Sequence, residues 1–466
     1  MRILLVLPAA DRYRVTRAAP RPPRRAPLRF SLLPLTTVAA LTPPGHQVIL
    51  CDENVEPLDT EAEVDLVGVG FMTALAPRAY QIAAAFRARG RRVVAGGYHP
   101  TLCTDEVLDH FDAVVAGEAE GAWPALLADA ERGALRRVYR AGPLPRAGAP
   151  PPRRDLQARI ARHYITTAAV QVGRGCAHAC RYCSIAAFHP SGYRARPVAE
   201  VVEELRGLPR DLILVDDNVI ADPAHARELL RAMAPLGKRW VGQCSIRIAD
   251  DPELLALARR SGCAGLFIGL ETLSAANLAA VDKSFADAHG YRVRLRAIRR
   301  AGVGVIAGIM VGLDADDATV FERTLRFLER NRVDAVQVNI LTPLPGTPLF
   351  EQFRRSGRIA STDWSRYDFR HCVIRPARMS AEELQAGADW MYRRFYRLDR
   401  VLLRALRSAL DLGPVGGWLG LRLGLTYRYD NRREGIEGWN PARGPGRRSF
   451  PGALARLIGR RRALAR

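Results

Sequence analysis

The chain has 466 residues, 48% of them hydrophobic and 25% charged, a composition that excludes fibrous, low-complexity and wholly disordered proteins. This length corresponds to two or three domains. The 70 basic and 48 acidic residues give a formal charge of +22, which raises the question of an anionic partner.

The basic excess is almost entirely arginine, because only two lysines are present, Lys238 and Lys283. Translation of a GC-rich gene produces such an excess without any selected patch. Since the sequence carries no recognition module that interleaves aromatic and basic residues, we expect no nucleic-acid partner.

The first third of the chain alternates short apolar runs with helical patterns. This alternation predicts a doubly wound, Rossmann-like α/β domain over residues 1–135, with ligands at the carboxyl ends of its strands. An Arg- and Pro-rich insert at residues 12–29 is expected to form a mobile loop. The predicted strands are residues 3–7, 47–51, 66–70, 93–95 and 113–116, with helices around residues 76–89 and 120–130.

An interdomain linker is predicted over residues 136–163, which are rich in Arg, Pro, Gly and Ala. A second alternating series predicts a partial (βα)6 TIM-type barrel over residues 164–375, with function at the carboxyl ends of its strands. Residues 376–466 are predicted to form a mostly helical, Arg-rich C-terminal extension. The expected barrel strands are residues 166–172, 212–215, 241–245, 265–269, 303–308 and 335–340.

The strongest chemical signal is the segment VGRGCAHACRYCS, where Cys176, Cys180 and Cys183 follow the first barrel strand. Three thiolates on a short loop can hold three irons of a 4Fe-4S cluster and leave the fourth open to a small molecule. A zinc site completed by His178 or His189 is the alternative, although zinc ligands more often come in C-x2-C pairs.

This triplet, its place before a series of βα units, and the aromatic Tyr182 before the last cysteine resemble the radical S-adenosylmethionine (SAM) superfamily. The resemblance implies a 4Fe-4S cluster whose open iron chelates SAM. It also implies reductive cleavage of SAM to a 5′-deoxyadenosyl radical that removes a hydrogen atom from the substrate.

Polar residues at two further strand ends fit the same family. LILVDDN, with Asp216, Asp217 and Asn218, is similar to the acidic stretch that meets the methionine amine, although such carboxylates can also cap the next helix. LFIGLETLS, with Glu271 and Thr272, is similar to a stretch near the nucleoside. A buried Glu in an apolar strand end favours a ligand role.

The fifth barrel strand, VGVIAGIMVGLDADD, resembles the adenine-binding strand of the family. Gly304, Gly308 and Gly312 would let backbone approach the base, and tight barrel packing is the alternative explanation. The later segment TPLPGTPLF resembles a turn common in members with an N-terminal cobalamin domain.

Two segments of the first domain resemble the cobalamin-binding domain of such enzymes, GGYHPTL and DAVVAGEAEGAWPALL. Gly96, Gly97 and Gly117 would let a large planar ring approach backbone. Glu118 and Glu120 are expected to open the next helix, where the helix dipole favours carboxylates, and Glu118 is predicted at the cofactor. Because the Asp-x-His-x-x-Gly pattern is absent, we expect cobalt to be bound without an axial histidine, although His99 lies in the same segment and is predicted at the cofactor.

The leading hypothesis is a cobalamin-dependent radical SAM methyltransferase that acts on an unactivated carbon of a small molecule, with one SAM as methyl donor and another as radical source. The alternatives are a radical SAM cyclase or rearrangement enzyme, with or without retained cobalamin, and a noncatalytic iron-sulfur or cobalamin sensor. A methylthiotransferase acting on RNA would need three further N-terminal cysteines, and only Cys51 and Cys103 are present.

The predicted partners are the small-molecule substrate and an electron donor such as flavodoxin or ferredoxin. The segment at residues 413–425 is too interrupted to span a bilayer, and with its flanking arginines it would suit either a packed helical tail or a peripheral membrane contact. The short apolar run at residues 3–7 and the lack of a disulfide framework predict a cytoplasmic protein.

Overall fold

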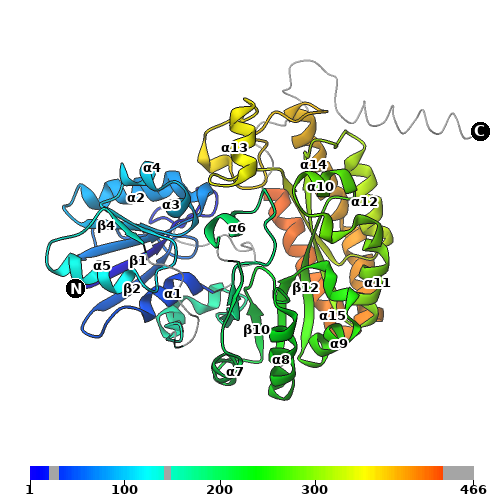
Figure 1. The fold of residues 1–466 in the computed structure, drawn as a ribbon, viewed down its shortest axis with the longest axis horizontal. Helices are drawn as coiled ribbons and strands as arrows, with labels where there is room; N and C mark the ends of the chain where they lie inside the picture. Colours follow the sequence, from blue (N-terminus) through cyan, green and yellow to red (C-terminus); the bar gives the residue numbers. More distant parts are fainter. Residues whose placement is uncertain (20–30, 141–147, 149, 191, 434–466) are drawn as a thin grey trace, which may run out of the picture.

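The computed structural model describes residues 1–19, 31–140, 148, 150–190 and 192–433. Two six-stranded sheets, each with helices packed against it, form two lobes that lie side by side (Figure 1). Residues 20–29 of the predicted mobile loop lie outside the described residues. So does the C-terminal extension beyond residue 433.

The sheet of the first lobe is fully parallel and has the order β2-β1-β3-β4-β5-β6. Its order reverses next to β1, and in doubly wound sheets ligands bind at this place, outside the carboxyl ends of the strands. The five predicted strands are confirmed, and β6 adds a sixth. The strands are β1 (Arg2–Leu7), β2 (Gln47–Asp52), β3 (Leu66–Gly70), β4 (Arg92–Gly96), β5 (Ala113–Ala116) and β6 (Val138–Arg140).

Both faces of this sheet are covered, because side chains along a strand alternate between the faces. Leu4 and Val6 pack with α2 (Ala76–Arg87) and α4 (Thr104–Leu108) on one face. Ile3 and Leu5 pack with α1 (Leu33–Ala40) and α5 (Trp123–Glu131) on the other. The short helix α3 (Tyr98–Leu102) follows β4 directly.

The sheet of the second lobe is also parallel, with the order β14-β13-β12-β11-β10-β7. Each strand therefore lies beside the strand of this sheet that precedes or follows it in the chain. This is the open series of βα units expected of a partial barrel. Its first strand is shorter than predicted. The strands are β7 (Ala169–Val170), β10 (Asp211–Leu214), β11 (Arg239–Cys244), β12 (Cys263–Glu271), β13 (Gly304–Val311) and β14 (Ala335–Ile340).

Amphipathic helices alternate with these strands and place their apolar side chains in one large core. They are α7 (Val198–Arg206), α8 (Pro223–Met233), α9 (Pro252–Arg260), α10 (Ala275–Ala280), α11 (Tyr291–Arg300) and α12 (Val320–Arg330). Later in the chain come α13 (Pro348–Arg355), α14 (Ala381–Phe395) and α15 (Leu398–Arg433). The described part of the predicted C-terminal extension is therefore helical, but α14 also packs on β14 and belongs to the lobe.

Two described parts of the segment predicted as a linker belong to the first lobe. β6 pairs with β5, and Tyr139 is 2% exposed. The 3-10 segment η2 (Arg154–His163) buries Ile160 in the same core as α1 and α5. The first lobe therefore extends beyond residue 135.

The last helix, α15, is a hairpin of two arms. Gly413 has a φ of +81°, and Pro414 follows it. The Cβ of a side chain at Gly417 would lie 2.5 Å from Cβ of Ala409, and one at Gly424 would lie 2.8 Å from Val401. Glycines thus let the second arm pack closely against the first. Among the described residues, no helix has the length and apolar character needed to cross a membrane.

Candidate functional site

The three predicted cluster cysteines lie in a loop between β8 (Gly173–Arg174) and α6 (Ser184–Phe188). β8 pairs with β9 (Arg194–Ala195) in a small antiparallel ribbon. Gly175 has a φ of +83°, and a Cβ there would lie 2.2 Å from the carbonyl oxygen of Gly192. Only glycine therefore fits at the point where the loop leaves the ribbon.

The donor set fits an iron-sulfur cluster. Cys176, Cys180 and Cys183 are free thiols on one short loop, close enough for the charges of Cys183 and Cys176 to raise the pKa of Cys180. Burial is the larger cause and raises the pKa of Cys180 to about 11, against the opposing charge of Lys283. Bound iron would supply the positive charge that buried thiolates require.

A buried triad lies beside the cysteines. Glu271, the last residue of β12, accepts hydrogen bonds from the Tyr182 hydroxyl at 3.0 Å and from Lys283 Nζ at 2.6 Å. Lys283 also donates to the Tyr182 hydroxyl at 3.0 Å. Burial alone would lower the pKa of Lys283, but Glu271 raises it, so the amine stays charged. Glu271 has a φ of +61°, a strained conformation for a non-glycine residue.

Lys283 was not predicted as a site residue, although its rarity in the sequence pointed to it. A lysine retained in a chain whose basic residues are almost all arginine indicates a place where the compact ammonium group is needed. Its side chain is 12% exposed, which is unusual for lysine.

The three polar residues after β10 have different partners. Asp216 is buried and accepts backbone hydrogen bonds from Val172 at 2.9 Å and Gly173 at 2.6 Å. It therefore fixes the chain leading to the cysteine loop, and this placement does not favour a contact with the methionine amine. Asn218 accepts from the backbone of Ser245 at 3.1 Å.

Asp217 lies close enough to the cysteine loop for its charge to add to burial in raising the pKa of Cys183. Burial raises its pKa to about 6, and His189 acts in the opposite direction. After burial itself, Asp217 is the next cause that raises the pKa of Tyr98. The role predicted for the whole stretch therefore suits Asp217 best.

The other residues predicted near the nucleoside are less well placed. Thr272 is buried and accepts a hydrogen bond from the backbone of Ser274. Gly304 is the first residue of β13, at the amino ends of the strands and opposite the cysteine loop, which does not favour its predicted cofactor contact. Gly308 lies in mid-strand, where a Cβ would contact the Phe267 ring at 2.9 Å, which favours the packing explanation.

The glycines predicted at the cobalamin ring end the strands β4 and β5 of the first lobe. Gly97 has a φ of +108°, and a Cβ there would meet the carbonyl oxygen of Phe71 at 2.8 Å. At Gly96 the nearest described atom to an added Cβ is Val115 Cβ at 4.0 Å, and at Gly117 no described atom lies within 4 Å. The space above Gly96 and Gly117 is therefore open for a ligand.

His99 lies inside the first lobe and has no exposed surface. Its Nδ1 is 3.3 Å from Oγ1 of Thr73 and its Nε2 is 3.1 Å from the Tyr80 hydroxyl. Burial lowers its pKa to about 4, against the opposing effect of Glu106. A buried imidazole with two partners does not favour the predicted contact with cobalamin.

The two predicted halves of the site face each other across the lobe boundary. Helix α3 lies beside α6, which follows the cysteine loop (Figure 1). The ring of Tyr98 in α3 is 4.6 Å from that of Phe188 in α6. Gly346, in the predicted turn after β14, approaches Leu102 of α3 so closely that a Cβ would lie 2.8 Å away. Tyr98 was not singled out from the sequence, although it lies within the GGYHPTL segment.

An ion-pair layer joins the lobes between these halves. Arg194, His189 at 3.3 Å and Arg174 at 3.5 Å all contact Glu118 Oε1. Burial alone would raise the pKa of Glu118, but hydrogen bonds from His189 and Arg194 and the charge of Arg174 lower it to about 2. Arg174 also pairs with Glu120. We refer to these five residues as the interlobe layer.

The interlobe layer corrects one prediction. The helix after β5 begins at Trp123 and has no acidic residue in its first turn, so Glu118 and Glu120 precede the helix and act through arginines of the other lobe. The pairing of Glu118 and Glu120 with these arginines could not be predicted from the sequence, because Arg174 and Arg194 belong to β8 and β9 of the other lobe.

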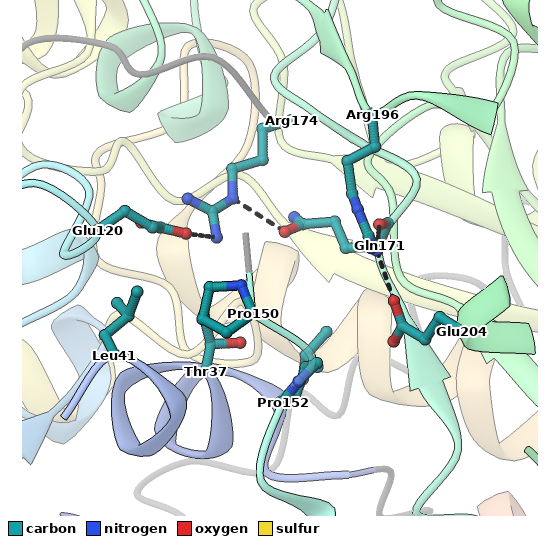
Figure 2. Close-up of a pocket in the computed structure, with 10 residues that line it drawn as sticks. Thr37, Leu41, Glu120, Pro150, Pro152, Gln171, Arg174, Arg196 and Glu204 are labelled. Atoms are coloured by element: carbon teal, nitrogen blue, oxygen red, sulfur yellow. Dashed lines mark hydrogen bonds and ion pairs between the residues drawn. The ribbon is translucent and has the colours of Figure 1, made fainter. Parts of the chain in front are cut away.

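Two residues of the interlobe layer, Glu120 and Arg174, line the pocket in Figure 2. It is a small cavity of about 30 Å3 that opens to solvent between α1 and the start of the second lobe. Arg174 points across it toward Glu120, and Arg196 pairs with Glu204 at 2.7 Å (Figure 2). None of the three cysteines lines it, so it is separate from the predicted site of chemistry.

Comparisons with known proteins agree with both halves of the site. Residues 170–346 match the family model of the radical SAM superfamily, and residues 29–127 match that of the B12 binding domain. Two similar proteins come from Chlorobaculum tepidum. Bacteriochlorophyllide d C-12(1)-methyltransferase is 30% identical over 81% of this chain and 85% of its own. Bacteriochlorophyllide d C-8(2)-methyltransferase is 27% identical over 81% and 88%.

The fold is also found in the radical SAM methyltransferase TsrM from Kitasatospora setae, solved with cobalamin and a 4Fe-4S cluster. The TM-score is 0.61 at 16% identity, over 76% of this chain and 78% of TsrM. The cluster and SAM follow from the radical SAM domain, and cobalamin follows from the B12 binding domain. The open cysteine loop, the glycine-edged sheet that faces it and these matches together show that the chain belongs to the cobalamin-dependent radical SAM enzymes.

Proposed function

We propose that this enzyme transfers a methyl group to an unactivated carbon of a small organic substrate. The observation that carries the proposal is that the open edge at Gly96 and Gly117 faces the loop of Cys176, Cys180 and Cys183. When bound, the cluster and SAM supply a 5′-deoxyadenosyl radical, and cobalamin supplies the methyl group.

The chain's own residues would bind the cofactors and orient them toward each other. The three cysteines would hold the cluster and leave one iron open. Glu271 and Lys283 keep a fixed pair of charges beside it, and Asp217 presents a carboxyl group from the neighbouring strand end. The interlobe layer fixes the distance between the two cofactor sites, which favours reaction between groups that each lobe holds.

The substrate class that we propose is a tetrapyrrole with an alkyl side chain. The relatives named for bacteriochlorophyllide d methylation support this choice, because they match over four-fifths of the chain. A small electron-carrying protein of the flavodoxin or ferredoxin kind is the proposed reductant. The proposed location is the cytoplasm, which fits eight free cysteines.

Methyl transfer can be tested before the substrate is known. The protein is reconstituted anaerobically with iron, sulfide and hydroxocobalamin, reduced, and supplied with SAM that carries a deuterated methyl group. We expect mass spectrometry to find labelled methylcobalamin and S-adenosylhomocysteine, and then labelled product with a bacteriochlorophyllide acceptor. Cleavage to 5′-deoxyadenosine without any labelled methylcobalamin would instead identify a cyclase or rearrangement enzyme.

A further inference from the structure

The exposed hydrophobic side chains of this protein are concentrated on α15. Eleven large hydrophobic residues are exposed in the described chain, and eight of them belong to this one helical hairpin. The other three, Met72, Ile165 and Val293, lie apart from one another in the sequence. A clustered set of this kind marks an interaction surface more strongly than scattered residues do.

Five leucines of the first arm form a continuous surface, which we call the leucine face. Leu398, Leu402, Leu406 and Leu410 follow at intervals of four residues and therefore lie along one side of the helix. With Leu403 they are 37 to 77% exposed. The arm packs against the second arm through Val401 and Ala409, whereas these five leucines remain exposed. The leucine face is thus left open by the fold.

Positive charge accompanies the leucine face. Arg407 lies between Leu403 and Leu410 in helical spacing, and no ion pair or hydrogen bond joins it to the rest of the described chain. In the second arm the Arg422 guanidinium lies 5.3 Å from the ring of Trp418, which is 57% exposed. Trp beside Arg is a pairing typical of membrane interfaces.

The negative charges of the first arm are already neutralised. Asp399 pairs with Arg397 at 3.1 Å, and Asp411 pairs with Arg299 at 3.0 Å. Beyond the described residues, the sequence at positions 438–466 contains eight arginines and no acidic residue. Apolar surface with a surplus of arginine on and after it is complementary to anionic lipid.

We propose that the α15 hairpin binds the surface of an anionic lipid bilayer, with the leucine face at the boundary of the acyl chains and Arg407 and Arg422 at the headgroups. Because no described helix can cross a membrane, the contact is peripheral. The proposal rests on the surface of α15 alone. It would stand if the reaction were a cyclisation instead of a methylation.

The test is flotation of the reconstituted full-length protein with lipid vesicles. One set contains only phosphatidylcholine, and the other contains about 30% phosphatidylglycerol as the anionic lipid. We expect at least about tenfold more protein on the anionic vesicles, with binding that falls as salt is added. Equal binding to both sets, or no binding to either, would overturn the proposal.

Substitutions then locate the contact. The triple variant Leu402→Ser, Leu406→Ser, Leu410→Ser should lose about tenfold in binding to anionic vesicles, and Arg407→Ala should lose a smaller part. Val293→Ser is the matched control, because Val293 is 72% exposed on α11, and it should bind like wild type. Unchanged iron content and SAM cleavage show that each variant is folded.

Two further results keep the proposal falsifiable. If the triple variant does not fold, the single change Leu410→Glu at the most exposed leucine should still reduce binding. If instead the leucine substitutions convert a dimer to a monomer in sedimentation and leave vesicle binding unchanged, the leucine face is a contact between copies of the chain, and the lipid proposal is wrong.

Discussion

Lys283 and Glu271 form a buried ion pair, and removal of the lysine would leave the Glu271 carboxylate without its cation. Glu271 ends β12 with a positive φ, and both of its hydrogen-bond donors, Tyr182 and Lys283, approach the same oxygen. A buried carboxylate deprived of its ammonium partner keeps its charge at a high cost or takes up a proton. Either result changes the electrostatics beside the cysteines.

We expect Lys283→Met to weaken SAM binding by at least about tenfold and to destabilise the protein by about 3 kcal/mol, because Glu271 is left unpaired in a buried position. Equilibrium binding of SAM to the reconstituted protein and thermal unfolding measure the two effects. Lys238→Met removes the only other lysine and is the control. Wild-type SAM affinity in Lys283→Met would remove Lys283 from the site.

Gly96 offers the cleaner test of cobalamin binding. A side chain at Gly97 is strained by a φ of +108° and by the Phe71 carbonyl, so loss of cobalamin in a Gly97 variant would not distinguish ring exclusion from misfolding. Gly96→Phe places bulk in open space. We expect cobalt retained after desalting to fall to near zero, with iron near four per chain as in the family's cluster. Wild-type cobalt content would mean that the ring lies elsewhere.

At the scale of whole elements, long apolar runs were the most informative part of the sequence. β1, β3 and β5 each contain an unbroken run of four buried residues, so their length and composition alone predict strands. β6 and β8 have three and two residues, too short for any period to show. The interlobe layer also could not be predicted, because Glu118 and Arg194 are joined only by the packing of two lobes.

Within the site, motifs predicted positions better than roles. The cysteine triplet is on one loop, as expected, but Asp216 holds the backbone and Gly304 is at the opposite end of its strand. A motif gives residue type and spacing. It does not show which of three neighbouring polar side chains points outward, because that depends on the local backbone.

The interlobe layer predicts a separation between two measured activities. Glu118→Gln keeps the shape of the side chain but removes the charge that Arg174, Arg194 and His189 share. We expect labelled methyl transfer to fall by at least about tenfold while SAM cleavage falls by about twofold, because the distance between cofactor sites changes and the cluster does not. Glu203→Gln, an exposed residue paired with Arg206, is the control. Equal losses in both activities would contradict this role.

The stability of the whole molecule depends on pH through His99 in the first lobe. The pKa of His99 is about 4 in the folded state and near 6.5 when exposed. The unfolded chain therefore binds a proton first as pH falls. The stability contributed by neutral His99 is present above pH 6.5 and is lost between pH 6.5 and 4, amounting to about 3 kcal/mol.

We expect His99→Gln to unfold with a weaker dependence on pH between 6.5 and 4 than wild type does, because Gln can form hydrogen bonds but does not titrate in this range. Thermal unfolding at several pH values measures this difference. His289→Gln, at an exposed position, should follow the wild-type profile. Parallel profiles for all three proteins would show that His99 is already protonated in the folded lobe.

The packing of β6 and of residues 154–164 against the first lobe decides where this chain can be divided. A fragment that ends at residue 135 would lose β6, uncover the hydrogen-bonding edge of β5 and remove Ile160 from its core. It would also lose the hydrogen bond of 2.6 Å from the Tyr164 hydroxyl to Asp52. A cobalamin-binding fragment prepared for titration or crystallisation should therefore end just after Tyr164, and one cut at the start of the arginine-rich stretch should aggregate.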